Sequence, residues 1–88
     1  MKIKDEFALR EIAGQGIVVA TGKRALSFNG MIRLNEVSIL IWKMLETGVD
    51  KQQIAEKVTS VYNVEERVAA ADIDALVSKL IAADVVEE

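Results

Sequence analysis

The period of the hydrophobic pattern changes abruptly at Asn35. In the four residues before it, a period of two places Met31 and Arg33 on one side of a strand and Ile32 and Leu34 on the other. After it, apolar residues recur at the spacing of one helix face. The sequence therefore predicts a short strand that leads directly into a helix, with Ile32 and Leu34 facing the helices.

Asn35 itself is predicted to cap that helix. Its side chain is short enough to accept a hydrogen bond from the backbone N–H of Val37 or Ser38, which would otherwise lack a partner. The apolar pattern extends the helix over residues 36–47, and Gly48 is well placed to end it. The only tryptophan of the chain lies inside this helix, where its spacing favours a place in the core.

Two further helices follow. Asp50 with Gln53 three residues later is typical of a capping box, and it predicts a second helix that ends near Tyr62. A third helix is predicted over residues 64–83, where the periodic pattern is longest. The apolar face of this third helix is expected to consist of Ala69, Ile73, Leu76, Val77 and Leu80.

The part of the chain before residue 31 is typical of strands and turns. Alternating residues predict a strand from Phe7 to Ile12, with one slip of phase near Glu11. The glycine-rich segment 13–16 predicts a hairpin turn, and β-branched residues at 17–21 predict the returning strand. A short additional strand at Ala25–Phe28 is a weaker expectation, and the last four residues are expected to be extended or frayed.

The element order, three strands and then three helices, predicts an α+β fold. The 88 residues of the chain suffice for one domain. This domain is expected to consist of a small three-stranded antiparallel sheet followed by three helices, in a winged helix-turn-helix-like arrangement. No apolar stretch approaches the roughly 20 residues that cross a bilayer, and the first residues do not resemble a signal peptide. A cytoplasmic protein is therefore expected.

The chain lacks the side chains that most catalytic and metal sites use. It contains neither histidine nor cysteine, so the usual general base, the thiol nucleophile and the best transition-metal ligands are missing. Asp72 and Asp74 are two residues apart on a predicted helix and point in different directions, which argues against a working carboxylate pair. We expect no catalytic residues, no metal and no cofactor, and hence no enzyme.

The charge distribution weighs against binding to nucleic acid. Residues 1–34 carry six basic and three acidic groups, whereas residues 64–88 carry two basic and seven acidic ones. In a winged helix the third helix would enter the DNA groove, but here its acidic side chains would repel phosphates. A DNA-binding regulator is kept as the alternative hypothesis because the element order permits it.

The segment "FNGMIRLNEVSILIWKMLETG" at residues 28–48 resembles the signature of the PqqD-like family. The likeness extends over residues 6–86, through the hairpin, the second helix and the third. It departs at Val37-Ser38, where the family often has Thr-Gly, and at Asp84, where it usually has glycine. Aspartate tolerates the left-handed conformation better than most residues, so the helix end is expected to survive. The residues that carry the family pattern are Leu34, Asn35, Ile41, Trp42 and Leu45.

The resemblance implies a function as a peptide-recognition element of ribosomally made, modified peptides. Such proteins bind the leader segment of a precursor peptide as an extra strand and present it to a modifying enzyme, often a radical S-adenosylmethionine (radical SAM) enzyme. The leader pairs with the third strand, and the third helix forms the other wall. A module that docks only to an enzyme is a further possibility, and the free strand edge permits a monomer or a weak homodimer. The residues that the resemblance implies for peptide binding are Met31, Ile32, Arg33, Leu34, Ile73, Leu76, Val77 and Leu80. The sequence does not separate the helix residues that line a groove from those that form the core.

Overall fold

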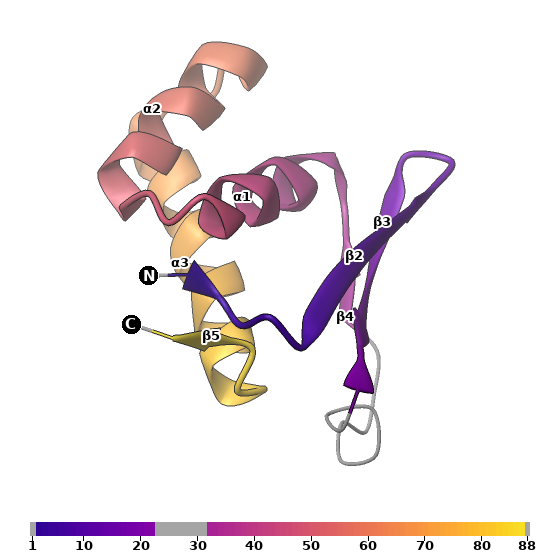
Figure 1. Cartoon of the computed structure of the whole chain (residues 1–88). Helices are drawn as coiled ribbons and strands as arrows, with labels where there is room; N and C mark the ends of the chain where they lie inside the picture. The colour runs from indigo at the N-terminus through magenta and orange to yellow at the C-terminus, as the bar shows by residue number, and fades with distance from the viewer. Residues whose placement is uncertain (1, 23–31, 88) are drawn as a thin grey trace.

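A three-stranded antiparallel sheet packs beside three helices, and a two-stranded ribbon lies next to them (Figure 1). The computed structural model describes residues 2–22 and 32–87. The predicted α+β fold is confirmed. The additional strand expected at 25–28 and Met31 lie outside the described residues. The described elements are β1 (Lys2–Ile3), β2 (Phe7–Ile12), β3 (Gln15–Ala20), β4 (Ile32–Leu34), α1 (Glu36–Glu46), α2 (Lys51–Tyr62), α3 (Glu66–Ala82) and β5 (Val86–Glu87).

The hairpin between β2 and β3 is tighter than the sequence suggested. Only Ala13 and Gly14 form the turn, with φ angles of 52° and 79°, and Ile12 pairs directly with Gln15. Two positive φ angles are typical of the two-residue turns that match the twist of a hairpin. The slip of the apolar pattern near Glu11 is not a slip of the strand, because the register is regular along the whole of β2. Ile12 therefore points to the outer face, where 67% of its surface is exposed.

Gly16 lies inside β3 and not in the turn. A Cβ atom at this position would come within 2.8 Å of Leu9 Cδ1 and 2.9 Å of Ile39 Cγ1. The missing side chain therefore allows α1 to pack closely on the inner face of the sheet. The glycine that looked like turn chemistry serves the contact between helix and sheet.

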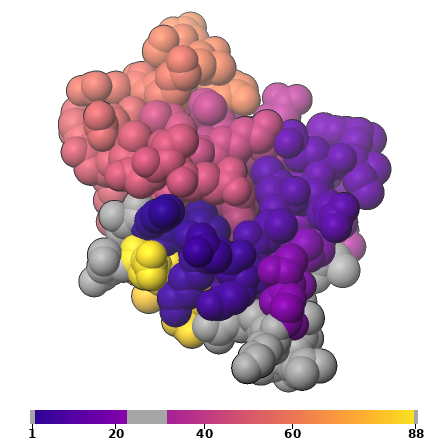
Figure 2. Space-filling model, in the orientation of Figure 1, coloured from indigo at the N-terminus to yellow at the C-terminus, as the bar shows by residue number. Residues whose placement is uncertain are grey.

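The ribbon of β1 and β5 brings residues near the two ends of the chain together. Ile3 pairs with Val86, and both side chains are buried. Figure 2 shows the indigo N-terminal and yellow C-terminal segments side by side on the surface. The tail was expected to be extended or frayed, and within it Val86–Glu87 is extended, whereas Glu88 lies outside the described residues. No strand was predicted at residues 2–3. Asp84 has a φ of 60°, which confirms the expected left-handed end of α3, and its carboxylate forms a salt bridge with Lys4.

The predicted helix caps are confirmed. The Oδ1 atom of Asn35 accepts a hydrogen bond from the Ser38 N–H at 2.9 Å, and Asp50 forms a capping box with Gln53. Helix α1 is one residue shorter than predicted. Helix α3 begins at Glu66 instead of residue 64, and its N-cap residue makes no side-chain capping bond.

The core lies between the inner face of the sheet, the ribbon and the three helices. Trp42 and Leu45 are fully buried, as their spacing predicted, and Ile39 joins them although it was not expected in the core. The residues Val37, Leu40 and Met44 lie at its margin and are only partly buried. None of the helices in the described part of the chain is long and apolar enough to span a membrane.

Candidate functional site

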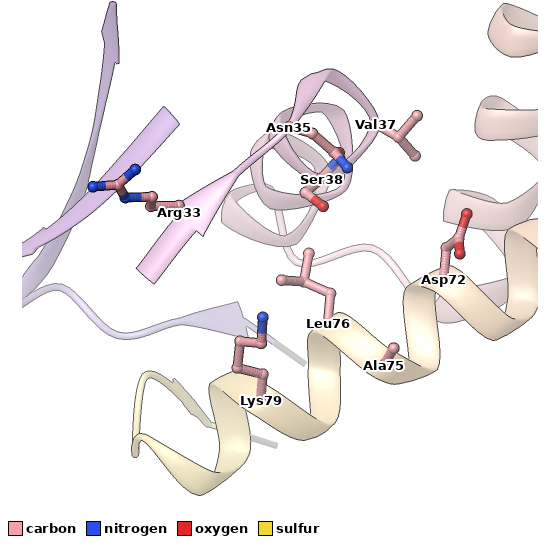
Figure 3. Close-up of a pocket in the computed structure, with 8 residues that line it drawn as sticks. All are labelled: Arg33, Asn35, Val37, Ser38, Asp72, Ala75, Leu76 and Lys79. Carbon is pink, nitrogen blue, oxygen red and sulfur yellow. The ribbon is translucent and has the colours of Figure 1, made fainter. Parts of the chain in front are cut away.

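A pocket of about 250 Å³ lies between β4, the start of α1 and α3 (Figure 3). One wall comes from β4 and the α1 N-terminus, and the opposite wall comes from α3. We call this pocket the β4–α3 groove. It is lined by Arg33, Asn35, Val37, Ser38, Asp72, Ala75, Leu76 and Lys79.

The α3 wall is a single stripe of side chains. Asp72, Ala75, Leu76 and Lys79 recur every three or four residues, which places them on one face of the helix. Figure 3 shows all four on the side of α3 that is turned toward β4 and α1. Leu76 is only 6% exposed and forms the apolar floor, whereas the other three side chains are exposed. The stripe therefore offers one apolar contact between an acid and a base.

The β4 wall is the edge of the sheet, and the hairpin register tells which of its backbone groups point outward. In a two-residue hairpin the residues that close the turn, here Ile12 and Gln15, exchange hydrogen bonds, and bonded and non-bonded pairs then alternate. The hydrogen bond from the Thr21 N–H to the Glu6 carbonyl, at 2.7 Å, agrees with this alternation at the far end of the hairpin. It follows that Gly16 and the other even-numbered residues of β3 direct their backbone groups toward β4.

The same alternation fixes the orientation of β4. Leu34 pairs with Gly16 and Ile32 with Val18, so these two β4 residues use their N–H and C=O groups within the sheet. Arg33 lies between them and directs its backbone N–H and C=O away from β3. Neither group bonds to another backbone group of the described residues. The edge of β4 thus presents one unpaired donor and one unpaired acceptor beside α3.

Three charged side chains line the β4–α3 groove. Arg33, Asp72 and Lys79 make no ion pair with another described residue. By contrast, Asp74, two residues from Asp72, pairs with Lys51 of α2 at 3.0 Å. The groove carries a formal charge of +1 in a chain whose net charge is −3.

The structure distributes the eight residues that the resemblance implied for binding over different environments. Arg33 and Leu76 line the β4–α3 groove. Met31 lies outside the described residues. The remaining five are buried in the core, and they are Ile32, Leu34, Ile73, Val77 and Leu80.

The groove also contains residues that were not predicted to bind peptide. Asp72, Ala75 and Lys79 fall beside the apolar stripe of α3, and their helical spacing was a signal that could have identified them. Val37 and Ser38 could not be identified in this way, because only the packing of α3 brings them to the same pocket. No group of three or more potential metal ligands occurs within residues 2–22 and 32–87.

Comparisons with known proteins agree with this architecture. TbiB1, solved in complex with the TbiA(beta) leader peptide, is 22% identical, with a TM-score of 0.80 over 99% of this chain and 95% of that one. Lasso peptide synthetase B1, complexed with the leader peptide, is 26% identical, with a TM-score of 0.72 over 92% of this chain and 89% of that one. No curated protein sequence matches the chain.

The comparison with protein families identifies the chain over most of its length. The family described as coenzyme PQQ synthesis protein D (PqqD) matches residues 16–86. This match includes β4, α1 and α3, the three elements that form the groove. The chain therefore belongs to the PqqD family.

Proposed function

We propose that this protein binds the leader segment of a ribosomally made precursor peptide in the β4–α3 groove and presents it to a modifying enzyme. The leader adds to β4 as a fourth strand of the sheet. The observation that carries this proposal is the outward backbone N–H and C=O of Arg33 beside a second wall formed by α3. An extended peptide can satisfy both groups at once.

The family and the similar structures support a peptide as the ligand. Both TbiB1 and lasso peptide synthetase B1 were solved in complex with a leader peptide. Both resemble this chain over nearly its whole length. A leader peptide is therefore the ligand class that fits both the free strand edge and the relatives.

Side chains of the groove supplement the backbone contacts. A three-residue strand offers few backbone hydrogen bonds, each of which contributes a net ~1 kcal/mol. Alternate side chains of an added strand would point toward α3, where Leu76 and Ala75 offer apolar contact. We infer that main-chain bonds position the leader and that the α3 stripe determines which leaders bind.

The modification of the bound peptide is carried out by a partner enzyme and not by this chain. The sequence contains no histidine or cysteine, and the Ser38 hydroxyl in the groove makes no hydrogen bond to Asp72 or Lys79 that could activate it as a nucleophile. We infer a non-catalytic role in which the modifying enzyme, such as a radical SAM protein, acts on the presented peptide. The DNA-binding alternative is not favoured, because the relatives bind peptides and α3 is acidic.

Amide chemical shifts test the proposal directly. The isotopically labelled protein is titrated with the leader of the precursor peptide encoded nearest its gene. We expect the largest shifts at Arg33, Asn35, Leu76 and Lys79, because they surround the groove. Residues on α2, such as Lys57, are expected to stay unchanged.

The opposite edge of the sheet provides the competing outcome. By the same alternation of bonded pairs, Leu9 and Glu11 of β2 direct their backbone groups away from β3. Shifts that centre on these two residues and spare Arg33 would place the peptide at the wrong edge. Such a result, or no shift at any concentration that the peptide's solubility allows, would refute binding in the β4–α3 groove.

A further inference from the structure

We infer that the β4–α3 groove selects peptides by the order of their charges: a basic residue, an apolar residue two positions later, and an acidic residue two positions after that. This inference rests on the proposed function, since it specifies the ligand of the same groove. The complementary groups on α3 are Asp72 for the base, Leu76 for the apolar residue and Lys79 for the acid.

The spacing on α3 matches alternate residues of a strand. Lys79 lies seven residues after Asp72, which corresponds to roughly 10 Å along the helix axis. Three alternate residues of a strand span roughly 13 Å. The lysine side chain is long enough to cover the difference between these two lengths, because its ammonium group is carried by four flexible methylene groups and Lys79 is exposed. Leu76 lies between the two charges and faces the middle residue of the three.

The direction of the peptide follows from the sheet. Figure 3 shows that β4 runs from Arg33 toward Asn35, while α3 runs in the opposite sense, from Asp72 toward Lys79. All pairs within the three-stranded sheet are antiparallel, and an antiparallel fourth strand continues this pattern. The peptide then runs in the same sense as α3, so its earlier residues face Asp72 and its later residues face Lys79.

The two charges are available for a ligand. Neither Asp72 nor Lys79 forms an ion pair with another described side chain, whereas Asp74 of the same helix pairs with Lys51. Exposed charge pairs contribute little affinity individually, a factor of about two to five each. Their main effect is discrimination, because a peptide with the reversed order meets two repulsions instead of two attractions. Reversal is therefore expected to weaken binding by about tenfold.

A selection from random peptides tests the inference without knowledge of the natural ligand. The protein is used to enrich a displayed library of random dodecapeptides. Binders are kept if they shift the amide of Arg33, and for the best one a second peptide is made with its basic and acidic residues exchanged. Affinities are measured for the wild type, for Lys79→Glu combined with Asp72→Lys, and for Lys57→Glu, which changes the same type of charge on α2 outside the groove.

The possible outcomes distinguish failure of the charge-order inference from failure of peptide binding in the β4–α3 groove. We expect the enriched peptides to carry the base–apolar–acid order, the exchanged peptide to bind about tenfold more weakly, and the double variant to reverse this preference. Lys57→Glu should preserve it. If the binders shift Arg33 but tolerate either charge order, the inference is wrong while the proposed function stands. If no enriched peptide shifts Arg33, the proposed function fails and the inference fails with it.

Discussion

Two faces of α3 differ in burial, although some of their residues are direct neighbours in the sequence. Ile73, Val77 and Leu80 are buried against the rest of the core. Asp72 and Lys79 immediately precede two of these residues, but they are exposed and line the β4–α3 groove. One face holds the fold together, and we propose that the other face recognises the ligand.

The difference between these faces shows that neighbouring residues can be tested separately. Substitutions on the buried face should change the free energy of unfolding, and substitutions on the groove face should change ligand binding. Asp72 and Asp74 show the same separation among charges, because only Asp74 is paired with α2.

Leu80→Ala is expected to lower the free energy of unfolding by about 2–5 kcal/mol, because it removes a fully buried side chain and leaves a cavity. The measurement is chemical denaturation followed by the fluorescence of the single tryptophan. Ile81→Ala is the matched control, since Ile81 is the next residue and 48% of its surface is exposed. Its effect should be a small fraction of the first. Equal losses for the two variants would contradict the assignment of the buried face.

Asn35→Ala is expected to destabilise the protein by about 1 kcal/mol, because the Ser38 N–H loses its hydrogen-bond acceptor. Asn35→Asp keeps an acceptor and adds a charge that suits the helix N-terminus, so it should retain the stability of the wild type. Thermal denaturation of both variants checks the difference. If the two variants are equally destabilised, the side-chain cap is not the cause of the loss.

Lys79→Glu is expected to lower the free energy of unfolding by about 1 kcal/mol or less, because the side chain is exposed and pairs with no described residue, so that only its interaction with the C-terminus of α3 changes. The same variant should alter the charge preference of bound peptides. Denaturation and peptide affinity are measured on one preparation. A large loss of stability would show that the groove face also supports the fold, and the comparison of the two faces would not hold.

Much of the fold was predictable because local signals agreed. The capping residues Asn35 and Asp50, the left-handed Asp84 and the buried Trp42 each follow from residue type and spacing. The pairing of β1 with β5 was not predictable in the same way. Two residues at each end carry no periodic signal, and they form strands only because the fold brings Ile3 and Val86 together.

The groove was less predictable than the fold. The sequence could identify β4 as a strand, but not which of its backbone groups would be unpaired. That depends on the turn at Ala13 and Gly14, which sets the phase of bonded pairs across the whole sheet. Gly16 looked like part of this turn, so the sequence did not show which residues close the hairpin or how β2 and β3 are paired. The exposed stripe beside the apolar face of α3 was visible in the sequence, but its partner across the groove was not.

The central claim is that a peptide pairs with the backbone of Arg33, and proline substitution tests it most directly. Arg33→Pro removes the outward N–H, which proline at a sheet edge can do without breaking the bonds to β3. Arg33→Ala removes the same charge but keeps the N–H. Glu11→Pro removes an outward N–H from the opposite edge. The affinity of each folded variant for the leader peptide is then compared, with the folded state checked by circular dichroism.

Strand addition at β4 predicts that Arg33→Pro binds about tenfold or more weakly than Arg33→Ala, because a peptide carbonyl loses its donor at the edge. Glu11→Pro should bind like the wild type. Equal affinities for Arg33→Pro and Arg33→Ala, or a loss of binding confined to Glu11→Pro, would contradict the pairing of the leader with β4.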